Sequence, residues 1–141
     1  MQQTLLIAEG DAELCDIYRR FLMERGYDVK TASDDLDCLR KLRQLTPDVL
    51  LLDLKLPWGG GDSVLAWLRK ENLTQEIPVI LTATAGCPLD LAEFIAPPVV
   101  ECLSKPFTLI ALLERVHSAI ATNAPREPSR RKRIFSELYI G

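Results

Sequence analysis

Short apolar segments alternate along the chain with segments whose apolar residues recur at helical spacing. Four apolar runs and one alternating run (27–32), all of strand length, are each followed by a change of pattern, which is typical of strands that end in loops. These runs cover residues 4–8 (TLLIA), 27–32 (YDVKTA), 48–53 (DVLLLD), 78–84 (PVILTAT) and 99–103 (VVECL).

A helix is predicted after each strand. The first has Asp11 as a possible cap and Gly26 as a stop, and the second ends before Pro47. The fourth is short, because only LDLAEFI is available, and Thr108 stands near the start of the last. The apolar positions that mark the other helices are Leu14, Ile17, Tyr18, Phe21 and Leu22; Leu36, Leu39 and Leu42; Val64, Leu65, Trp67 and Leu68; and Leu109, Leu112, Leu113, Val116 and Ile120.

The pattern therefore predicts an α/β fold of the (βα)5 type. Alternating strands and helices favour a doubly wound parallel sheet with helices on both faces and right-handed crossovers. We expect a flavodoxin-like, five-stranded sheet with strand order 2-1-3-4-5.

Composition limits the functional classes. With 141 residues and 48% hydrophobic residues, one domain with one core is expected. No apolar run is long enough to span a membrane and no signal peptide is recognisable, so we expect a cytoplasmic protein. Four scattered cysteines and a single histidine argue against zinc, and the cysteines (Cys15, Cys38, Cys87, Cys102) are expected to be reduced thiols.

Charge is distributed unevenly. The last 18 residues carry five basic and two acidic side chains, a net +3, so the remainder of a chain with net charge −3 carries −6. An acidic body makes nucleic acid an improbable partner.

Polar residues follow four of the predicted strands. In a parallel sheet, ligands bind outside the carboxyl ends of the strands. Glu9, Gly10 and Asp11, then Asp53, then Thr82 to Thr84, and finally Lys105 are thus expected to converge there.

These motifs resemble the receiver domain of bacterial response regulators, the phosphate-accepting half of two-component signalling. The resemblance covers Thr4 to Thr122 and rests on the acidic cluster, PDVLLLDLKLP with Gly61 four residues past the proline, PVILTAT and LSKPF. It implies a phosphoprotein that takes a phosphoryl group onto Asp53 from a sensor histidine kinase or phosphotransfer protein, and not an enzyme. The signal would pass to an output protein through the face of helix four, strand five and helix five.

The chemistry requires cations, because a carboxylate and a phosphoryl group repel each other. Mg²⁺ suits oxygen ligands and keeps several waters. The resemblance implies that Asp53 and the Lys55 carbonyl bind the ion and that Lys105 contacts the phosphoryl group. It also implies a cis bond between Lys105 and Pro106.

The sequence departs from the family at the acidic pair after the first strand. The family usually has two adjacent acids there, of which the second binds the metal, whereas this chain has Glu9 and Gly10. Mg²⁺ affinity is therefore expected to fall. Two residues are candidates to replace the lost ligand: Glu9, and Asp11, whose carboxylate is also placed to cap the following helix.

Two further family positions have changed. The hydroxyl residue that holds the phosphoryl group falls on Ala83 in a gapless register, with Thr82 and Thr84 on either side as candidates. The switch aromatic three residues before the lysine is replaced by Cys102. An output would therefore not use rotation of a buried Tyr or Phe at that position.

The predicted organisation is a receiver at residues 1–122 and a tail at 123–141 with a basic Pro/Arg linker and an apolar end, which is too short for a DNA-binding domain and is a possible site of homodimerisation. A stand-alone response regulator is the first hypothesis. The second is a degenerate receiver that binds partners without phosphorylation. A flavin or nucleotide carrier is disfavoured, because the loop AEGDAE is anionic and lacks a glycine-rich phosphate-binding pattern.

Overall fold

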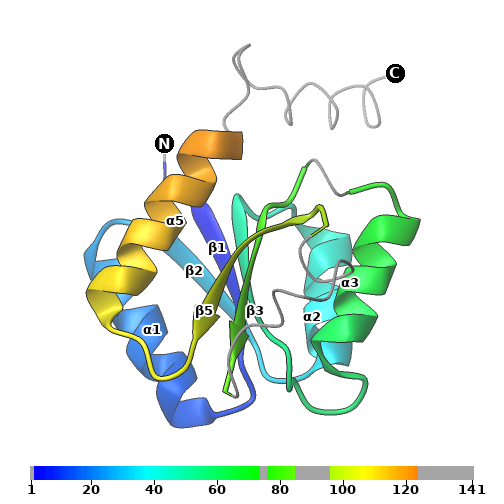
Figure 1. The fold of residues 1–141 in the computed structure, drawn as a ribbon, viewed down its shortest axis with the longest axis horizontal. Coiled ribbons are helices and arrows are strands. Elements are labelled where there is room, and N and C mark those ends of the chain that lie inside the picture. The colour runs from blue at the N-terminus through cyan, green and yellow to red at the C-terminus, as the bar shows by residue number, and fades with distance from the viewer. Residues whose placement is uncertain (1, 74–75, 85–95, 124–141) are drawn as a thin grey trace.

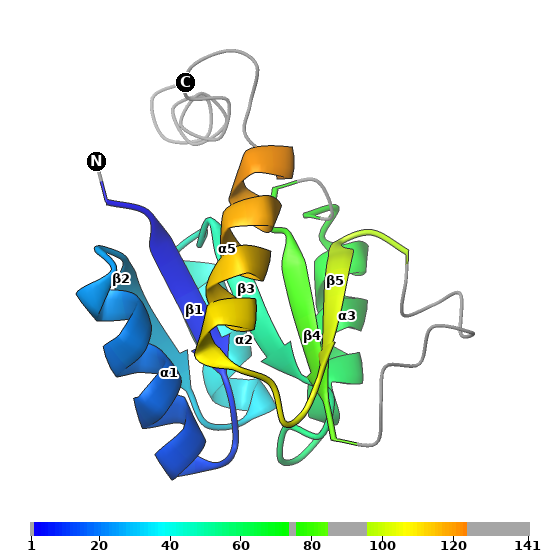
Figure 2. The same cartoon turned by 60° about the vertical axis from the view of Figure 1, so that its left-hand side comes forward.

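A computed structural model describes residues 2–73, 76–84 and 96–123. They form one parallel sheet of five strands in the order β2-β1-β3-β4-β5, as predicted (Figure 1; Figure 2). The strands are β1 (Thr4–Ala8), β2 (Asp28–Ala32), β3 (Val49–Asp53), β4 (Val79–Ala83) and β5 (Val99–Ser104).

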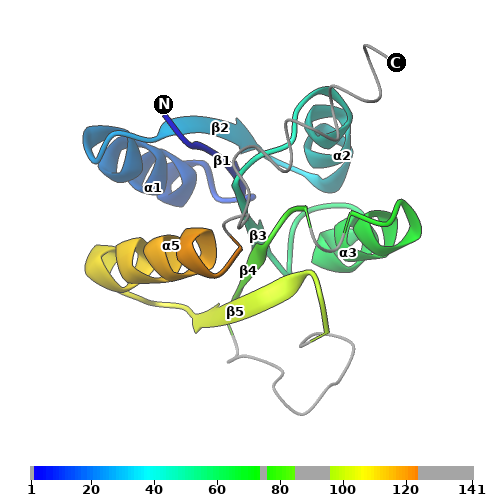
Figure 3. The same cartoon turned by 90° about the horizontal axis from the view of Figure 1, so that it is seen from above.

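Helices cover both faces of the sheet. Viewed along the layers in Figure 3, α1 (Ala12–Glu24) and α5 (Leu109–Asn123) lie on one side, and α2 (Asp35–Gln44) and α3 (Gly60–Lys70) lie on the other. The helix predicted from LDLAEFI and the tail at 124–141 lie outside the described residues.

The central strand contributes side chains to the hydrophobic core on both faces of the sheet. All five residues of β3 are buried, with Leu50 and Leu52 facing the α2/α3 side and Val49 and Leu51 facing the α1/α5 side. A strand covered on both faces is apolar at every position, and this is why VLLLD shows no polar alternation. Its final residue, Asp53, is then a buried charge at the carboxyl edge.

Capping residues set the helix ends close to the predicted positions. Asp11 caps α1, Asp34 caps α2, and the Thr108 hydroxyl accepts a hydrogen bond from the Ala111 N–H at the start of α5. One helical position differs from the pattern. Leu36, which was one of three leucines marking α2, is 66% exposed, and Cys38 takes the buried place instead.

The cysteines are not all thiols. Cys15 and Cys38 are free thiols, as expected. Cys102 is disulfide-bonded, so the prediction of a reduced thiol was wrong for this residue. Cys87 lies outside the described residues. In the part of the chain that is described, no helix has the length and apolarity needed to traverse a membrane.

Candidate functional site

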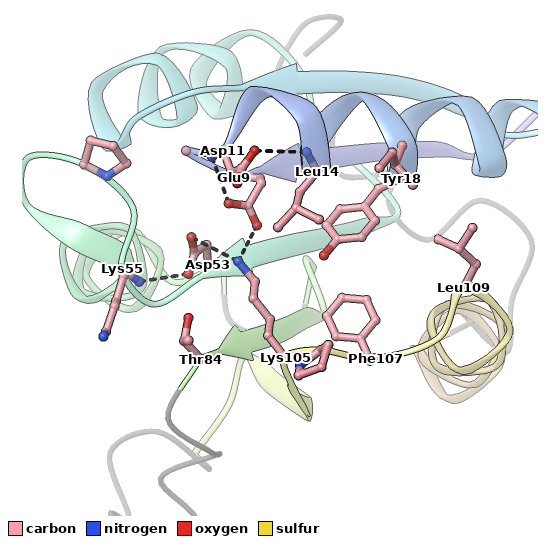
Figure 4. Close-up of a pocket in the computed structure, with 14 residues that line it drawn as sticks. Glu9, Asp11, Leu14, Tyr18, Asp53, Lys55, Thr84, Lys105, Phe107 and Leu109 are labelled. Carbon is pink, nitrogen blue, oxygen red and sulfur yellow. Dashed lines mark hydrogen bonds and ion pairs between the residues drawn. The ribbon is translucent and has the colours of Figure 1, made fainter.

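Three charged side chains from different strands meet at the carboxyl edge of the sheet (Figure 4). Glu9 follows β1, Asp53 ends β3 and Lys105 follows β5. The Lys105 Nζ lies 2.6 Å from Glu9 Oε1 and 3.4 Å from Asp53 Oδ2. The structure thus brings together the three groups that the strand ends predicted.

Glu9 is the most buried of the three, with a side chain only 4% exposed. Its Oε1 accepts a hydrogen bond from Lys105, and its Oε2 accepts one from the Asp11 backbone N–H at 3.0 Å. Burial raises the pKa of Glu9, and the hydrogen bonds from Lys105 and Asp11 partly oppose that shift. Both carboxylate oxygens are therefore in use.

Asp53 is held by the loop that follows it. Its Oδ1 accepts a hydrogen bond from the Lys55 N–H at 3.0 Å, which leaves Oδ2 toward Lys105. Gly61 packs beneath this turn, because a Cβ there would lie 2.9 Å from the Asp53 carbonyl oxygen. The Lys55 amine points away from Asp53 (Figure 4).

A cavity of about 660 Å³ opens beside Glu9 and Asp53. Glu9, Asp53 and Lys105 line its polar part, and Thr84 lines its rim. The remaining wall is mostly apolar and comes from α1 and the segment after β5: Leu14, Ile17, Tyr18, Pro106, Phe107 and Leu109.

Tyr18 and Phe107 form the apolar end of this cavity. Their rings stack with centroids 5.3 Å apart. Burial and, to a lesser extent, the charges of Glu9 and Asp53 raise the pKa of Tyr18 to about 12, so its hydroxyl stays neutral at physiological pH. From the sequence, Tyr18 was predicted only as part of a helical core stripe, and Phe107 entered only as the last residue of the LSKPF motif.

Asp11 performs the capping role that was one of its two predicted alternatives. Its Oδ1 accepts hydrogen bonds from the Glu13 and Leu14 N–H groups, at 3.0 and 3.2 Å. The residue also lines the cavity. Metal binding through Oδ1 would therefore compete with the helix cap.

Pro57 occupies the space beside Gly10. A Cβ on Gly10 would lie 2.7 Å from Pro57 Cδ and 3.0 Å from Pro57 Cγ. An acidic side chain at this position would require the proline ring to move. This contact is not visible in the sequence, because the two residues lie on different loops.

Thr84 is the predicted phosphate-binding hydroxyl residue that lines the cavity. It follows the last residue of β4 and lines the cavity, and its hydroxyl oxygen points toward Asp53 (Figure 4). Thr82 is only 1% exposed and is not among the residues that line this cavity, so its contact with phosphate stays a prediction. Thr82 lies inside a strand covered on both faces, whereas Thr84 lies beyond the strand, where alternation no longer applies.

The Lys105–Pro106 peptide bond is cis, as the resemblance implied. Cys102 stands where the family usually has its switch aromatic. It is half-buried and packs against the α2/α3 side of the core. No aromatic residue takes its place in β5.

Residues 5–117 match the family model described as the response regulator receiver domain. The chain belongs to the response regulator receiver family. Curated relatives agree: this receiver is 32% identical over 116 residues, or 82% of its length, to the DNA-binding dual master transcriptional regulator RpaA of Synechocystis. It is 26% identical over 125 residues, or 89% of its length, to the phosphate regulon transcriptional regulatory protein PhoB of Escherichia coli.

The receiver spans only about half the length of those relatives, 48% of RpaA and 55% of PhoB. Two solved structures align with this receiver over nearly their whole length. The receiver domain of the Francisella response regulator 1452 has a TM-score of 0.77 at 26% identity, covering 86% of this chain and 98% of that one. The chemotaxis response regulator CheY4 of Vibrio cholerae has the same TM-score at 23% identity, covering 84% and 99%, and supports the fold alone.

Receiver domains generally bind Mg²⁺ at this acidic pocket. Of the residues expected to bind the ion, Asp53, Lys55 and Glu9 line the cavity, and both carboxylate oxygens of Glu9 are already hydrogen-bonded. Within the described residues, no group of three or more His, Cys, Asp or Glu side chains is arranged to hold a metal ion. Because Mg²⁺ is usually bound by one or two carboxylates with waters and phosphate oxygens, the residues fit the ion with a reduced set of donors.

Proposed function

We propose that this receiver accepts a phosphoryl group on Asp53 from a sensor histidine kinase or a phosphotransfer protein, and that it acts as a signalling protein and not as an enzyme. The observation that carries the proposal is the position of Asp53 Oδ2, 3.4 Å from the Lys105 ammonium and open to a cavity of about 660 Å³. A buried carboxylate beside a cation and an accessible space has the features of a phosphoryl acceptor.

The transfer makes one bond and breaks one. An Asp53 oxygen forms the bond to phosphorus, the bond between phosphorus and the donor histidine nitrogen breaks, and that nitrogen keeps the electron pair. The Lys105 ammonium neutralises the incoming phosphoryl oxygens, for which it must leave Glu9. Thr84, whose hydroxyl points toward Asp53, donates a hydrogen bond to the bound group.

Mg²⁺, when bound, supplies the second positive charge for this reaction. Asp53 and the Lys55 carbonyl would hold it, with Glu9 as a further donor. Gly10 contributes no carboxylate, and Asp11 is engaged as a cap, so this receiver binds Mg²⁺ more weakly than relatives with two acids there. Phosphoryl oxygens add ligands, so metal and phosphate bind cooperatively.

The protein is proposed to work in the cytoplasm, where kinases of this class present their phosphohistidine. Its partners are the phosphodonor and an output protein, and homodimerisation through the tail is part of the same proposal. Of the predicted output face, β5 and α5 are described, and the intervening helix lies outside the described residues.

The test is the intact mass of the protein after incubation with Mg²⁺ and a small phosphodonor such as phosphoramidate. We expect an adduct of one phosphoryl group that is absent from Asp53→Ala. Asp28→Ala, which removes a carboxylate from the β2 edge, is the matched control and should be labelled like the wild type. An adduct that survives in Asp53→Ala would refute the assignment of the acceptor.

A second function is favoured by Gly10 and Ala83, which remove a metal ligand and a hydroxyl from the family's pattern. In that case the chain is a degenerate receiver that binds partners without phosphorylation. The same experiment separates the two functions, because a degenerate receiver forms no adduct at any Mg²⁺ concentration.

A further inference from the structure

The hydroxyl of Tyr18 is a polar group in the apolar part of the cavity wall. Tyr18 is only 5% exposed, and it lines the cavity together with Leu14 and Phe107. Within the described residues, this hydroxyl has no hydrogen-bond partner. A buried polar group without a partner is unfavourable and calls for an explanation.

The direction of the Tyr18 side chain follows from its place on α1. This helix begins three residues after Glu9, at the carboxyl edge of the sheet, and side chains on a helix lean toward its N-terminus. Tyr18 is therefore directed toward the edge that carries Asp53 and Lys105. In Figure 4 its hydroxyl points into the cavity on the side of Lys105. The electrostatics agree, because the charges of Glu9 and Asp53 contribute to the raised pKa of Tyr18.

Phe107 holds the tyrosine ring in this direction. The two rings are stacked, with an interplanar angle of 20°. Phe107 also follows Lys105 by only two residues, so one short segment fixes both the ring and the ammonium group. A phenylalanine at position 18 would make the same ring contact. The hydroxyl therefore contributes nothing to the stack, and its use must lie in the cavity.

The chemistry of the hydroxyl limits what it can bind. It is a neutral hydrogen-bond donor at physiological pH, since its pKa is about 12. The carboxylates of Glu9 and Asp53 already accept hydrogen bonds from the Asp11 and Lys55 N–H groups. Of the groups expected to enter the cavity, a phosphoryl group has anionic oxygens that accept strong, charge-assisted hydrogen bonds.

We propose that Tyr18 is a phosphoryl-binding residue, whose hydroxyl donates a hydrogen bond to an oxygen of the group that Asp53 receives. The inference rests on the proposed function. Figure 4 shows Tyr18 and Thr84 on opposite sides of Lys105, so the two hydroxyls would hold the group from two sides. A donor on α1 adds to the site at which Ala83 provides no hydroxyl.

The first experiment removes only the hydroxyl. Tyr18→Phe keeps the stack with Phe107, and formation of the adduct with phosphoramidate and Mg²⁺ is followed over time by intact mass. We expect the adduct to form about tenfold more slowly than in the wild type, as for the loss of a hydrogen bond to a charged group.

Tyr27→Phe is the matched control. Tyr27 is also buried, at 8% exposure, but its ring lies 6.3 Å from that of His117 and it is not among the residues that line this cavity. Its adduct should form within about twofold of the wild-type rate. The same loss of rate in both tyrosine variants would overturn the inference.

The second experiment measures binding without phosphoryl transfer. Beryllofluoride, a stable mimic of the phosphoryl group, is titrated by calorimetry in the presence of Mg²⁺. We expect Tyr18→Phe to bind beryllofluoride about tenfold more weakly than the wild type and to bind Mg²⁺ alone within about twofold of it. An equal loss for Mg²⁺ alone would overturn the assignment to the phosphoryl group.

Urea denaturation controls for a folding defect. Tyr18→Phe should be at least as stable as the wild type, because the removed hydroxyl has no partner in the described part of the chain. A loss of stability greater than that of Tyr27→Phe would show that the Tyr18 hydroxyl is bonded within the protein, and would overturn the inference.

The wild type separates the two proposals. An adduct that forms equally fast in the wild type and in Tyr18→Phe overturns the inference and leaves the proposed function intact. If the wild type forms no adduct and binds no beryllofluoride, the proposed function fails, and the role of Tyr18 fails with it.

Discussion

Lys105 Nζ lies 0.8 Å closer to Glu9 than to Asp53, at 2.6 Å against 3.4 Å. In the structure the lysine is therefore held mainly by Glu9 and less by the proposed phosphoacceptor. Since both carboxylates are buried, the ammonium is what allows them to share one site.

Replacing Lys105 by methionine should destabilise the fold by about 3 kcal/mol, because two buried carboxylates would lose their cation. Adding Glu9→Gln to that variant should recover at least about 1 kcal/mol, since one of the two unpaired charges is then removed. Urea denaturation of the four chains of this double-mutant cycle gives the coupling free energy.

A matched control for Lys105 is Lys30→Met, which breaks the exposed pair between Lys30 and Asp28 at 3.6 Å. We expect less than about 0.5 kcal/mol for that change. Equal losses for the two lysine variants would contradict a central role for the buried ammonium.

Glu9 should make the stability of the wild type depend on pH. Burial raises its pKa in the folded state above the reference value of 4.5. Between 4.5 and the raised pKa, the unfolded chain has released this proton and the folded chain retains it, so the folded state loses stability as pH rises through that window.

Glu9→Gln has no proton to release at this position. Its free energy of unfolding should therefore rise relative to the wild type as pH increases from 4 to 7, and the two chains should converge at pH 4. Denaturation across that range is the measurement, with Glu24→Gln at an exposed position of α1 as the control. A difference that shrinks with rising pH would mean that Lys105 outweighs burial and lowers the pKa of Glu9.

The sequence was sufficient to predict the sheet order and the meeting of Glu9, Asp53 and Lys105. The meeting of the three residues follows from a general constraint, because apolar runs identify the strands and parallel strands end at one edge. The order 2-1-3-4-5 is one of the two common orders of doubly wound sheets. The role of Asp11 as a cap also follows from its place before a helical pattern.

Other features depend on contacts between distant segments. The choice between Thr82 and Thr84 required knowing where β4 ends, and the exposure of Leu36 required knowing which side of α2 faces the sheet. The link from Asp35 to Gly59 joins the first residue of α2 to the residue before α3, 24 positions apart. Periodicity carries no signal for such pairs.

Asp11 allows capping and metal binding to be measured separately. Asp11→Ala removes the hydrogen bonds to the Glu13 and Leu14 N–H groups and should cost about 1 kcal/mol of folding free energy. Asp11→Asn keeps a good capping side chain and should retain most of that stability.

Mg²⁺ titration by calorimetry then tests the second role of Asp11. Because the capping oxygen is already engaged, we expect Asp11→Asn to bind Mg²⁺ within about twofold of the wild type. A loss of tenfold or more in Asp11→Asn, with stability preserved, would instead make Asp11 the replacement for the missing ligand.

Gly10→Asp should raise the affinity for Mg²⁺ by about tenfold or more, because it adds a carboxylate to a site whose donors are few. The gain should come with a loss of stability, since the new Cβ would lie 2.7 Å from Pro57 Cδ and the proline ring must shift. Calorimetric titration and urea denaturation of the same preparation measure the two effects.

Asp53→Asn in the Gly10→Asp background is the control and should abolish the gain, because both carboxylates are needed to hold the ion. Unchanged Mg²⁺ affinity in Gly10→Asp would show that Pro57 keeps the new side chain out of the site, and that more than the lost ligand separates this receiver from relatives with two acids.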